Sequence, residues 1–539
     1  MKPYATILGI LLLACQAFAI DARGAQQPKG NDEGPAQLTG RLSVIWGDPV
    51  GESTVAPYHS IWLTDDQNKT WALTVNEATL RAAGGILALN NTTVVVSGRT
   101  VRARRPTLAV ETITQTKDAG RDPIPRDISG SQPFIWLFFK FADNPNPTSE
   151  SFDWFEEQAL GEYGMDPFYR ELSYDTANMA GSTVFRWWFT LPRVPADYGI
   201  IGDPDNGDVN LDLLLWDALN LTIPVIDFTR YAGMVLVFNG PMDCCAWGGR
   251  PSLAFGGQPS RPFGVVWVGD GGFQGHDVMT HELGHAFGLP HSSGCGVEYQ
   301  SIWDLMGLSC GTCTQMDPRT NTPHGVHAIA YHKDRLGWIH PLHQYTLPQA
   351  AAGAAAARVW LYDLARVPPQ GQFLWARALV SPLTPSFYAI ERRCLTGYDA
   401  NLPDAVVDIH YVNEARSIPA DMFDVDGGEC NDEGSMWRPG ESFYDASNDV
   451  LIGIEWANES SSIVTLTNEP RANVYVNSSS GTCENGSSLC PWNTVSEGHA
   501  AVLPHGDVHI TSGFYPETLI MGKPAMLRPF GAGSVTIGE

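Results

Sequence analysis

The chain has 539 residues, too many for one ordinary domain, so three or four domains are expected. Its 43% hydrophobic and 10% aromatic residues are typical of folded protein rather than of disordered chains. The 59 acidic residues against 33 basic ones give a formal net charge of −26. A negative field of this size repels nucleic acid and anionic membrane surfaces, so neither is an expected partner.

The N-terminal residues 1–19 have the pattern of a signal peptide. An apolar run from Ala5 to Ala14 is followed by the small-x-small cleavage site Ala17-Phe18-Ala19. The run is too short to span a bilayer and no later stretch is long enough, so no membrane span is expected. Leu12-Leu13-Ala14-Cys15 resembles a bacterial lipoprotein box, which leaves a lipid anchor at Cys15 as the alternative. We therefore expect a secreted, extracellular protein, or else one anchored by lipid at the cell surface.

Residues 20–36 are rich in Gly, Gln, Pro and charge, and are predicted to form a flexible leader. Short alternating runs separated by turn signals follow in residues 37–118 and predict a small β-barrel, either a pro-region or an accessory domain. The barrel could resemble an oligonucleotide-binding fold, but a fold does not give a function and the charge argues against nucleic acid. Examples of these runs are Arg41–Trp46, Ser60–Leu63 and Thr92–Ser97.

Residues 128–345 alternate between strand and helix patterns and predict an α+β domain. Continuous apolar runs are typical of strands buried on both faces. Such runs occur at Phe134–Asp143, Met234–Asn239 and Gly264–Gly269, with further strands in Gly181–Leu191. Helices are predicted at Phe152–Leu160, Pro167–Ser173 and Asn210–Leu219.

The chemistry of this domain is predicted from the segment HELGHAFGLPH, which follows the last of these strands. His281 and His285 lie four residues apart, so on a helix both side chains project from one face and can bind one cation. Gly288 lets the chain leave the helix, so that His291 can return as a third imidazole. Three neutral nitrogens with an open fourth position are the ligand set of a catalytic Zn²⁺. Glu282 can reach a water held on that cation and take its proton.

Ten cysteines are present, and nine remain after cleavage at Ala19. In an oxidising compartment most should pair, with one thiol left over. Cys483 and Cys490 bracket a short loop and are the easiest pair to propose. Five more lie around the zinc motif and are expected to staple loops of the site: Cys244, Cys245, Cys295, Cys310 and Cys313.

Two acidic loops are candidates for Ca²⁺, because this hard cation prefers clustered oxygen ligands. The first is Asp203–Asp208, whose spacing departs from the helix-loop-helix calcium pattern at Gly207. Its alternative interpretation is a solvated loop in which Asp208 caps the next helix. The second cluster consists of Asp424, Asp426 and Glu429. Zn²⁺ is thus the predicted cofactor, and Ca²⁺ a further candidate.

After an alanine-rich stretch, residues 358–468 show short strand-like runs with frequent turns, which predict a β-sandwich. Ser386–Glu391 and Val450–Trp456 are two of these runs. Residues 472–539 predict a short parallel β-helix-like segment. Its strands are expected near Asp507–Thr511, Thr518–Met521 and Ser534–Ile537.

A methionine lies 15 residues after His291, in Trp303-Asp304-Leu305-Met306-Gly307. The long zinc motif followed by a methionine turn resembles the metzincin clan of metalloendopeptidases. The resemblance implies that Met306 lies beneath the zinc-binding imidazoles as an apolar floor. Some metzincins carry a zinc-contacting tyrosine two residues after this methionine, and here that position is Leu308.

Two later segments, Ala330–Ile339 and Phe387–Arg393, resemble gametolysin-like and immune inhibitor A-like peptidases. The third ligand His291 favours the gametolysin side, because immune inhibitor A-like enzymes have Asp there. The resemblance covers roughly residues 130–466. It implies a zincin catalytic domain followed by a sandwich, and it leaves the first 118 and the last 70 residues unexplained. Together with the strand patterns described above, the expected fold is multidomain α+β, with the zincin domain between an N-terminal β-barrel and a C-terminal β-sandwich plus a β-helix-like segment.

The expected function is a secreted zinc endopeptidase acting on protein or peptide substrates, with Glu282 as general base. One alternative is an extracellular adhesion or carbohydrate-binding protein with a vestigial zinc domain, and another is hydrolysis of non-peptide amides. No cysteine lies between Cys15 and Cys244, so inhibition of the zinc by a thiolate from residues 20–128 is excluded.

Overall fold

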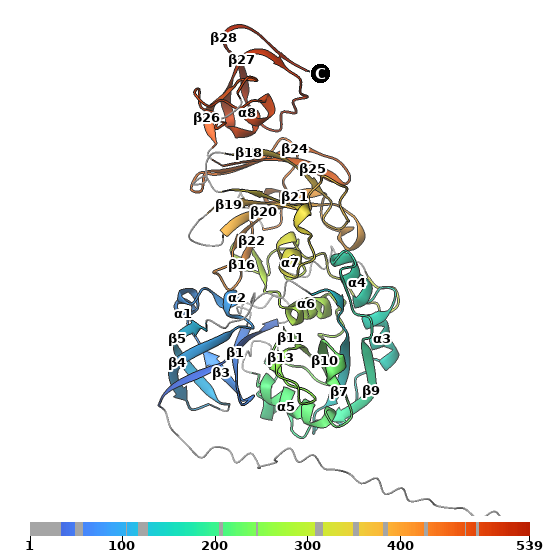
Figure 1. The fold of residues 1–539 in the computed structure, drawn as a ribbon. Helices are drawn as coiled ribbons and strands as arrows, with labels where there is room; N and C mark the ends of the chain where they lie inside the picture. The colour runs from blue at the N-terminus through green and yellow to red at the C-terminus, as the bar shows by residue number, and fades with distance from the viewer. Residues whose placement is uncertain are drawn as a thin grey trace, which may run out of the picture.

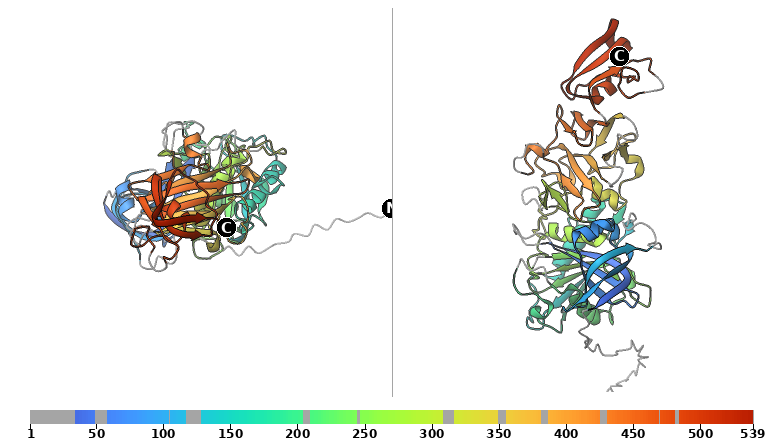
Figure 2. Two further views of the ribbon diagram at one scale, coloured as in Figure 1. Left: turned by 90° about the horizontal axis from the view of Figure 1, so that it is seen from above. Right: turned by 90° about the vertical axis from the view of Figure 1, so that its left-hand side faces the viewer.

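The computed structural model shows a multidomain, β-rich protein whose parts follow one another along a long axis (Figures 1 and 2). A barrel and an α/β unit lie side by side at one end, two packed sheets lie in the middle, and a three-stranded sheet forms the other end. The predicted signal peptide and Cys15 lie outside the described residues. The structure describes residues 34–48, 58–103, 105–116, 128–203, 209–243, 246–307, 316–348, 355–380, 386–424, 430–468, 470–480 and 484–538.

Five strands close a small N-terminal barrel, which confirms the β-barrel prediction. Strand β3 pairs parallel to β5, and the other pairings around the barrel are antiparallel. Alternate residues enter its core, as Val94 and Val96 do from β4, because side chains alternate between the two faces of a strand. The elements are β1 (Pro35–Asp48), β2 (Tyr58–Asp65), β3 (Thr70–Thr74), α1 (Glu77–Ala82), α2 (Ile86–Leu89), β4 (Thr93–Val101) and β5 (Thr107–Gln115).

The barrel is joined to the next unit through β1. On one edge, residues 35–41 of β1 pair with β4, and residues 45–48 pair antiparallel with β11 (Ala246–Gly249). Barrel and α/β unit therefore share one ten-stranded sheet. The close approach requires glycine at Gly47, where a Cβ atom would lie 2.2 Å from the ring of Trp247. Strand patterns give no sign of this continuity.

The α/β unit has five strands in the order β11-β14-β10-β7-β9, of which only β11 runs antiparallel to its neighbour. Phe134, Trp136 and Phe138 of β7 pack toward α3, α4 and α6. The intervening Ile135 and Leu137 pack toward α5 on the other face, which explains the continuous apolar run. The elements are β7 (Phe134–Lys140), α3 (Phe152–Leu160), α4 (Met165–Leu172), β9 (Thr183–Thr190), α5 (Leu211–Thr222), β10 (Gly233–Phe238), β14 (Gly264–Val268) and α6 (His276–Phe287).

Short elements fill the connections of this unit. Strands β6 (Gly130–Ser131) and β8 (Ala177–Asn178) pair parallel, and β12 (Ser252–Leu253) pairs antiparallel with β13 (Arg261–Pro262). Helix α7 (Ala330–Arg335) precedes the next unit. No helix in the described part of the chain combines the length and hydropathy needed to cross a bilayer.

Two sheets pack face to face in the middle of the molecule, around a common core that includes Ile390, Ile409, Ile452 and Val464. The four-stranded sheet contains β23 (Ser442–Asp445), β24 (Val450–Ala457), β25 (Ser461–Asn468) and β18 (Ala356–Tyr362). The seven-stranded sheet contains β16 (Val297–Glu298), β15 (Ser292–Gly294), β22 (Ala420–Met422), β21 (Val406–Asn413), β20 (Ser386–Arg393), β19 (Trp375–Leu379) and β17 (Gln344–Leu347). Three of its strands thus come from before the predicted start of the sandwich at residue 358.

The C-terminal unit is a parallel sheet of β26 (Arg471–Val476), β27 (Val502–Tyr515) and β28 (Met526–Ile537), with helix α8 (Val495–Ala501) packed on it. The parallel pairing is what a β-helix requires. The predicted strand Thr518–Met521 is wrong, because these residues form no strand. Leu519 is instead partly buried against the core of this unit, so its apolar character reflects packing rather than strand pairing.

Candidate metal centre

Helix α6 carries two of the predicted ligands and the predicted base. His281, Glu282 and His285 are all buried on it. Gly288 ends the helix with φ +106°, in the left-handed region that favours glycine. The chain then turns back, as the sequence predicts, and His291 follows with its side chain fully buried.

The three predicted histidine ligands come together at their Nε2 atoms. The distance is 3.0 Å between Nε2 of His281 and Nε2 of His285, and 2.8 Å between Nε2 of His285 and Nε2 of His291. A fourth donor, a carboxylate oxygen of Asp48, belongs to the same buried group, and all four ligand atoms lie within 4.8 Å of one another.

Each imidazole is oriented by a hydrogen bond from its other nitrogen. Donation from Nδ1 places the ring hydrogen there, so the lone pair of Nε2 points into the cluster. Three lone pairs directed at one another repel unless a positive charge lies between them, and the cluster is therefore fitted to a cation. The acceptors are the carbonyl oxygens of Leu305 and Leu289 and the carboxylate of Glu298, at 2.8, 2.7 and 2.6 Å. Three imidazoles and one carboxylate suit several divalent transition metals, Zn²⁺ among them.

Asp48 was not predicted as a site residue. It is the last residue of β1, and its side chain oxygens lie 2.9 Å from Nε2 of His291 and 3.1 Å from Nε2 of His281. No spacing signal could have found it, because it is one of 59 acidic residues and lies in a strand of a different predicted domain. The sequence predicts a fourth position open to solvent, whereas the structure places a buried carboxylate there.

Burial and neighbouring charges set the protonation of these groups. Burial lowers the pKa of His285 well below its usual value, and the two neighbouring imidazoles lower it further, so His285 is neutral. Burial also opposes the charged form of His291, but the carboxylates of Asp48 and Glu298 outweigh it and raise its pKa to about 9. The same carboxylates would stabilise a metal cation, which competes with the proton for the imidazole nitrogen.

Glu282 lies beside Asp48 and against strand β11. Burial opposes the charged form of Asp48, but His281 and His291 and, to a smaller extent, Glu282 hold the pKa of its carboxyl well below the usual value, so Glu282 lies close enough to influence Asp48. Gly248 of β11 makes room for Glu282, because a Cβ atom there would lie 2.8 Å from its Oε2 and 2.5 Å from its carbonyl oxygen. Glu282 is therefore held between β11 and the carboxylate of Asp48.

Met306 lies against the same helix turn as the two helical histidines. It is fully buried, and a Cβ atom on Gly284 would lie 2.5 Å from its Sδ. The preceding carbonyl, that of Leu305, orients the ring of His281. The segment predicted as a methionine turn thus contacts the ligands through both its backbone and its side chain. Leu308 lies outside the described residues.

Tyr299 is a second residue of the site that the sequence did not reveal. Its hydroxyl oxygen lies 3.1 Å from Nε2 of His291, and the hydroxyl donates a hydrogen bond to Asp48. It follows directly on Glu298, which orients His291. Neither residue stands at a spacing from the histidine motif that would single it out.

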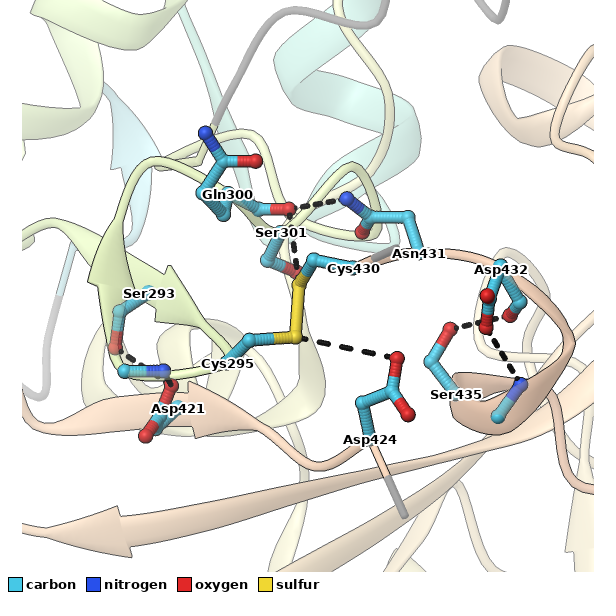
Figure 3. Close-up of a disulfide and its surroundings, with 12 residues drawn as sticks. Ser293, Cys295, Gln300, Ser301, Asp421, Asp424, Cys430, Asn431, Asp432 and Ser435 are labelled. Atoms are coloured by element: carbon cyan, nitrogen blue, oxygen red, sulfur yellow. Dashed lines mark hydrogen bonds between the residues drawn. A yellow bond between two sulfur atoms is a disulfide. The ribbon is translucent and has the colours of Figure 1, made fainter. Parts of the chain in front are cut away.

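The strand that follows His291 is held by the sandwich (Figure 3). Strand β15 pairs parallel with β22, and the disulfide Cys295–Cys430 joins the same two regions with a Cα–Cα distance of 6.0 Å. The side chain of Asp421 accepts hydrogen bonds from the hydroxyl of Ser293 and the backbone N–H of Gly296, both at 3.0 Å. The segment that follows His291 is therefore held by β22 and by Cys430.

The cysteine predictions have mixed outcomes. Cys295 is paired close to the site, as expected, but its partner Cys430 was not in the predicted set. Cys490 is disulfide-bonded, while its predicted partner Cys483 lies outside the described residues. Cys394 is the free, buried cysteine of the described residues. The other four cysteines predicted near the motif lie outside them, as do residues 204–208 and 425–429, which contain most of the proposed Ca²⁺ ligands.

A buried charged network supports the segment that carries Met306. Arg393 of β20 donates to Asp399 through Nε and Nη2, at 2.9 and 2.7 Å, and to the carbonyl oxygen of Trp303 through Nη1. Nearby, Nδ1 of His332 lies 2.8 Å from a carboxylate oxygen of Asp304. All of these side chains are buried, and the charged Arg393 joins the sandwich to the α/β unit through its hydrogen bond to the Trp303 carbonyl.

Comparison with family models and with curated proteins identifies no relative of this chain. No family model matches the chain, and no curated protein matches it either.

Proposed function

We propose that this chain is a secreted zinc-dependent endopeptidase, with a zincin-type catalytic unit that resembles gametolysin-like metzincins. One observation supports the proposal above all. Three oriented imidazole Nε2 atoms converge in a buried cluster, and the buried carboxylate of Glu282 lies next to it on the same helix. A hydrolase of this kind needs both a cation site and an adjacent base.

The residues of the site divide the chemistry between them. His281, His285 and His291 would hold Zn²⁺, which polarises a substrate carbonyl and lowers the pKa of a coordinated water to about 7. Glu282 takes the proton of the attacking water and passes it to the leaving amine. In the structure the hydroxyl of Tyr299 donates a hydrogen bond to Asp48. When the scissile carbonyl oxygen of a substrate takes the place of that carboxylate, the same hydroxyl donates to it and stabilises its negative charge.

The test is hydrolysis of casein by the purified full-length chain and by an Asp48→Ala variant. The variant is included because Asp48 fills the position next to the three histidines that a water would need. We expect cleavage that 1,10-phenanthroline abolishes and added Zn²⁺ restores. Stoichiometric zinc without cleavage of casein or of a peptide library by either protein would overturn the proposal and favour the adhesion alternative. Activity on small amides alone would favour a non-peptide amidase.

Replacement of Tyr299 by phenylalanine tests the role of its hydroxyl. Removal of one donor to a developing oxyanion lowers kcat about 100-fold, with little change in KM, because the contact strengthens in the transition state. The measurement is steady-state peptide hydrolysis in the Asp48→Ala background. Tyr444→Phe, at an exposed position of the sandwich, is the matched control and keeps the parent rate. An unchanged kcat in Tyr299→Phe would assign Tyr299 a packing role only.

A further inference from the structure

The N-terminal barrel reaches the metal centre through the end of one strand. Within the described residues, Asp48 is the group of the barrel that joins the three histidines in the buried cluster. Both of its oxygens are engaged, one with His291 and the other with His281. A site with four protein donors is closed, as in structural zinc sites, whereas hydrolysis requires a position for water and substrate.

The same strand covers the edge of the catalytic sheet. Apart from β1, strand β11 is the outer strand of the α/β unit, and its free edge would offer backbone N–H and C=O groups to an extended peptide. That edge is paired instead, with Ile45 opposite Gly249 and Asp48 opposite Ala246. A peptide can reach β11 at this point only if β1 leaves it.

The side chains around Asp48 complete the closure. The indole ring of Trp46 stacks on the imidazole of His285, with ring centres 5.7 Å apart and an interplanar angle of 16°. Of the two groups assigned to the reaction, Tyr299 donates a hydrogen bond to Asp48, and the side chain of Glu282 interacts with the same carboxylate. The barrel thus fills the fourth ligand position, pairs with the edge of β11 and contacts the side chains assigned to the reaction.

Resting on the proposed function, we propose that the N-terminal barrel keeps this peptidase latent. Strand β1 lies on β11 in the place of the substrate, and Asp48 fills the fourth ligand position. The barrel is therefore an inhibitory segment in cis that acts through a carboxylate. This arrangement replaces the thiolate mechanism that the absence of cysteine between Cys15 and Cys244 excludes.

The test uses the full-length chain loaded with Co²⁺, whose visible spectrum reports on its ligands, titrated with acetohydroxamate as a metal-binding probe. If Asp48 leaves the metal site of the natural chain open less than about a tenth of the time, the apparent affinity of that site for the probe is at least about tenfold below its intrinsic affinity. Asp48→Ala, whose site is always open, therefore binds the probe at least about tenfold more tightly than the natural chain. Asp48→Asn preserves the shape of the side chain and follows the same direction. Asp66→Ala, an exposed position on the barrel, behaves as the natural chain does.

With Zn²⁺, Asp48→Ala also cleaves casein at least about tenfold faster than the natural chain, by the same argument. Equal probe affinity in the natural chain and in both Asp48 variants would overturn latency, whatever the hydrolysis rates. Tighter probe binding without hydrolysis in any variant would overturn the peptidase proposal and, with it, the latent role. The spectrum would then still show that Asp48 closes the metal site.

Discussion

Replacing Glu282 by glutamine lowers kcat/KM for peptide hydrolysis by about 10³-fold or more, while the bound zinc remains stoichiometric. The carboxylate is the proton acceptor in the proposed reaction, and positioned general bases contribute on the order of 10²–10⁴-fold. Glutamine keeps the size of the side chain in the space that Gly248 leaves for it, so the helix is not disturbed. The measurements are steady-state kinetics in the Asp48→Ala background and metal content by atomic absorption.

Glu298→Gln is the matched control for that experiment. Glu298 accepts a hydrogen bond from Nδ1 of His291 and does not lie at the reacting position, so its loss weakens zinc binding about 10–100-fold. At saturating zinc its hydrolysis rate stays much closer to the parent than that of Glu282→Gln. Equal losses of rate at full zinc occupancy in both variants would contradict the assignment of Glu282 as the base.

Replacing Arg393 by methionine lowers the stability of the α/β unit and the sandwich by about 3–5 kcal/mol. Removal of one partner from a buried ion pair leaves the other charge without compensation in a low-dielectric interior. Here the carboxylates of Asp399 and Glu391 lose their cation, and the carbonyl of Trp303 loses a donor. Scanning calorimetry at a fixed scan rate measures the shift of the thermal transition.

Arg438→Met is the control for this prediction, because Arg438 pairs with Asp404 at 2.9 Å on the surface of the sandwich. Exposed ion pairs contribute roughly 0–1 kcal/mol, so its transition moves little. If Arg393→Met shifts the transition no more than Arg438→Met does, the buried network is not what joins the two units.

The elements with strong patterns could be predicted from the sequence. The predicted helix Phe152–Leu160 coincides with α3, and the apolar run from Phe134 corresponds to β7, because burial on both faces leaves a continuous signal. The grouping of the three histidines could be predicted because a single helix turn and one glycine bring them together. Whether they act on peptides stays a prediction.

The rest of the site is built from contacts between distant parts of the chain. Asp48 comes from the barrel, and β15 is a three-residue strand that pairs with β22 far along the sequence. A strand this short has no periodicity to detect, and a single carboxylate among many stands at no recognisable spacing from the histidine motif. For the same reason the sequence gives no sign that the seven-stranded sheet includes β15 and β16 from the segment after His291.

The pairing of β15 with β22 has a consequence for biosynthesis. A nascent chain that ends before Ala420 already contains all three histidines and the short partner strand β16, yet β15 still lacks β22, which pairs with all three of its residues. The cation site therefore reaches its final form only when the sandwich has been translated and folded. A product truncated before Ala420 would therefore lack a contact that helps to hold His291 in the cluster.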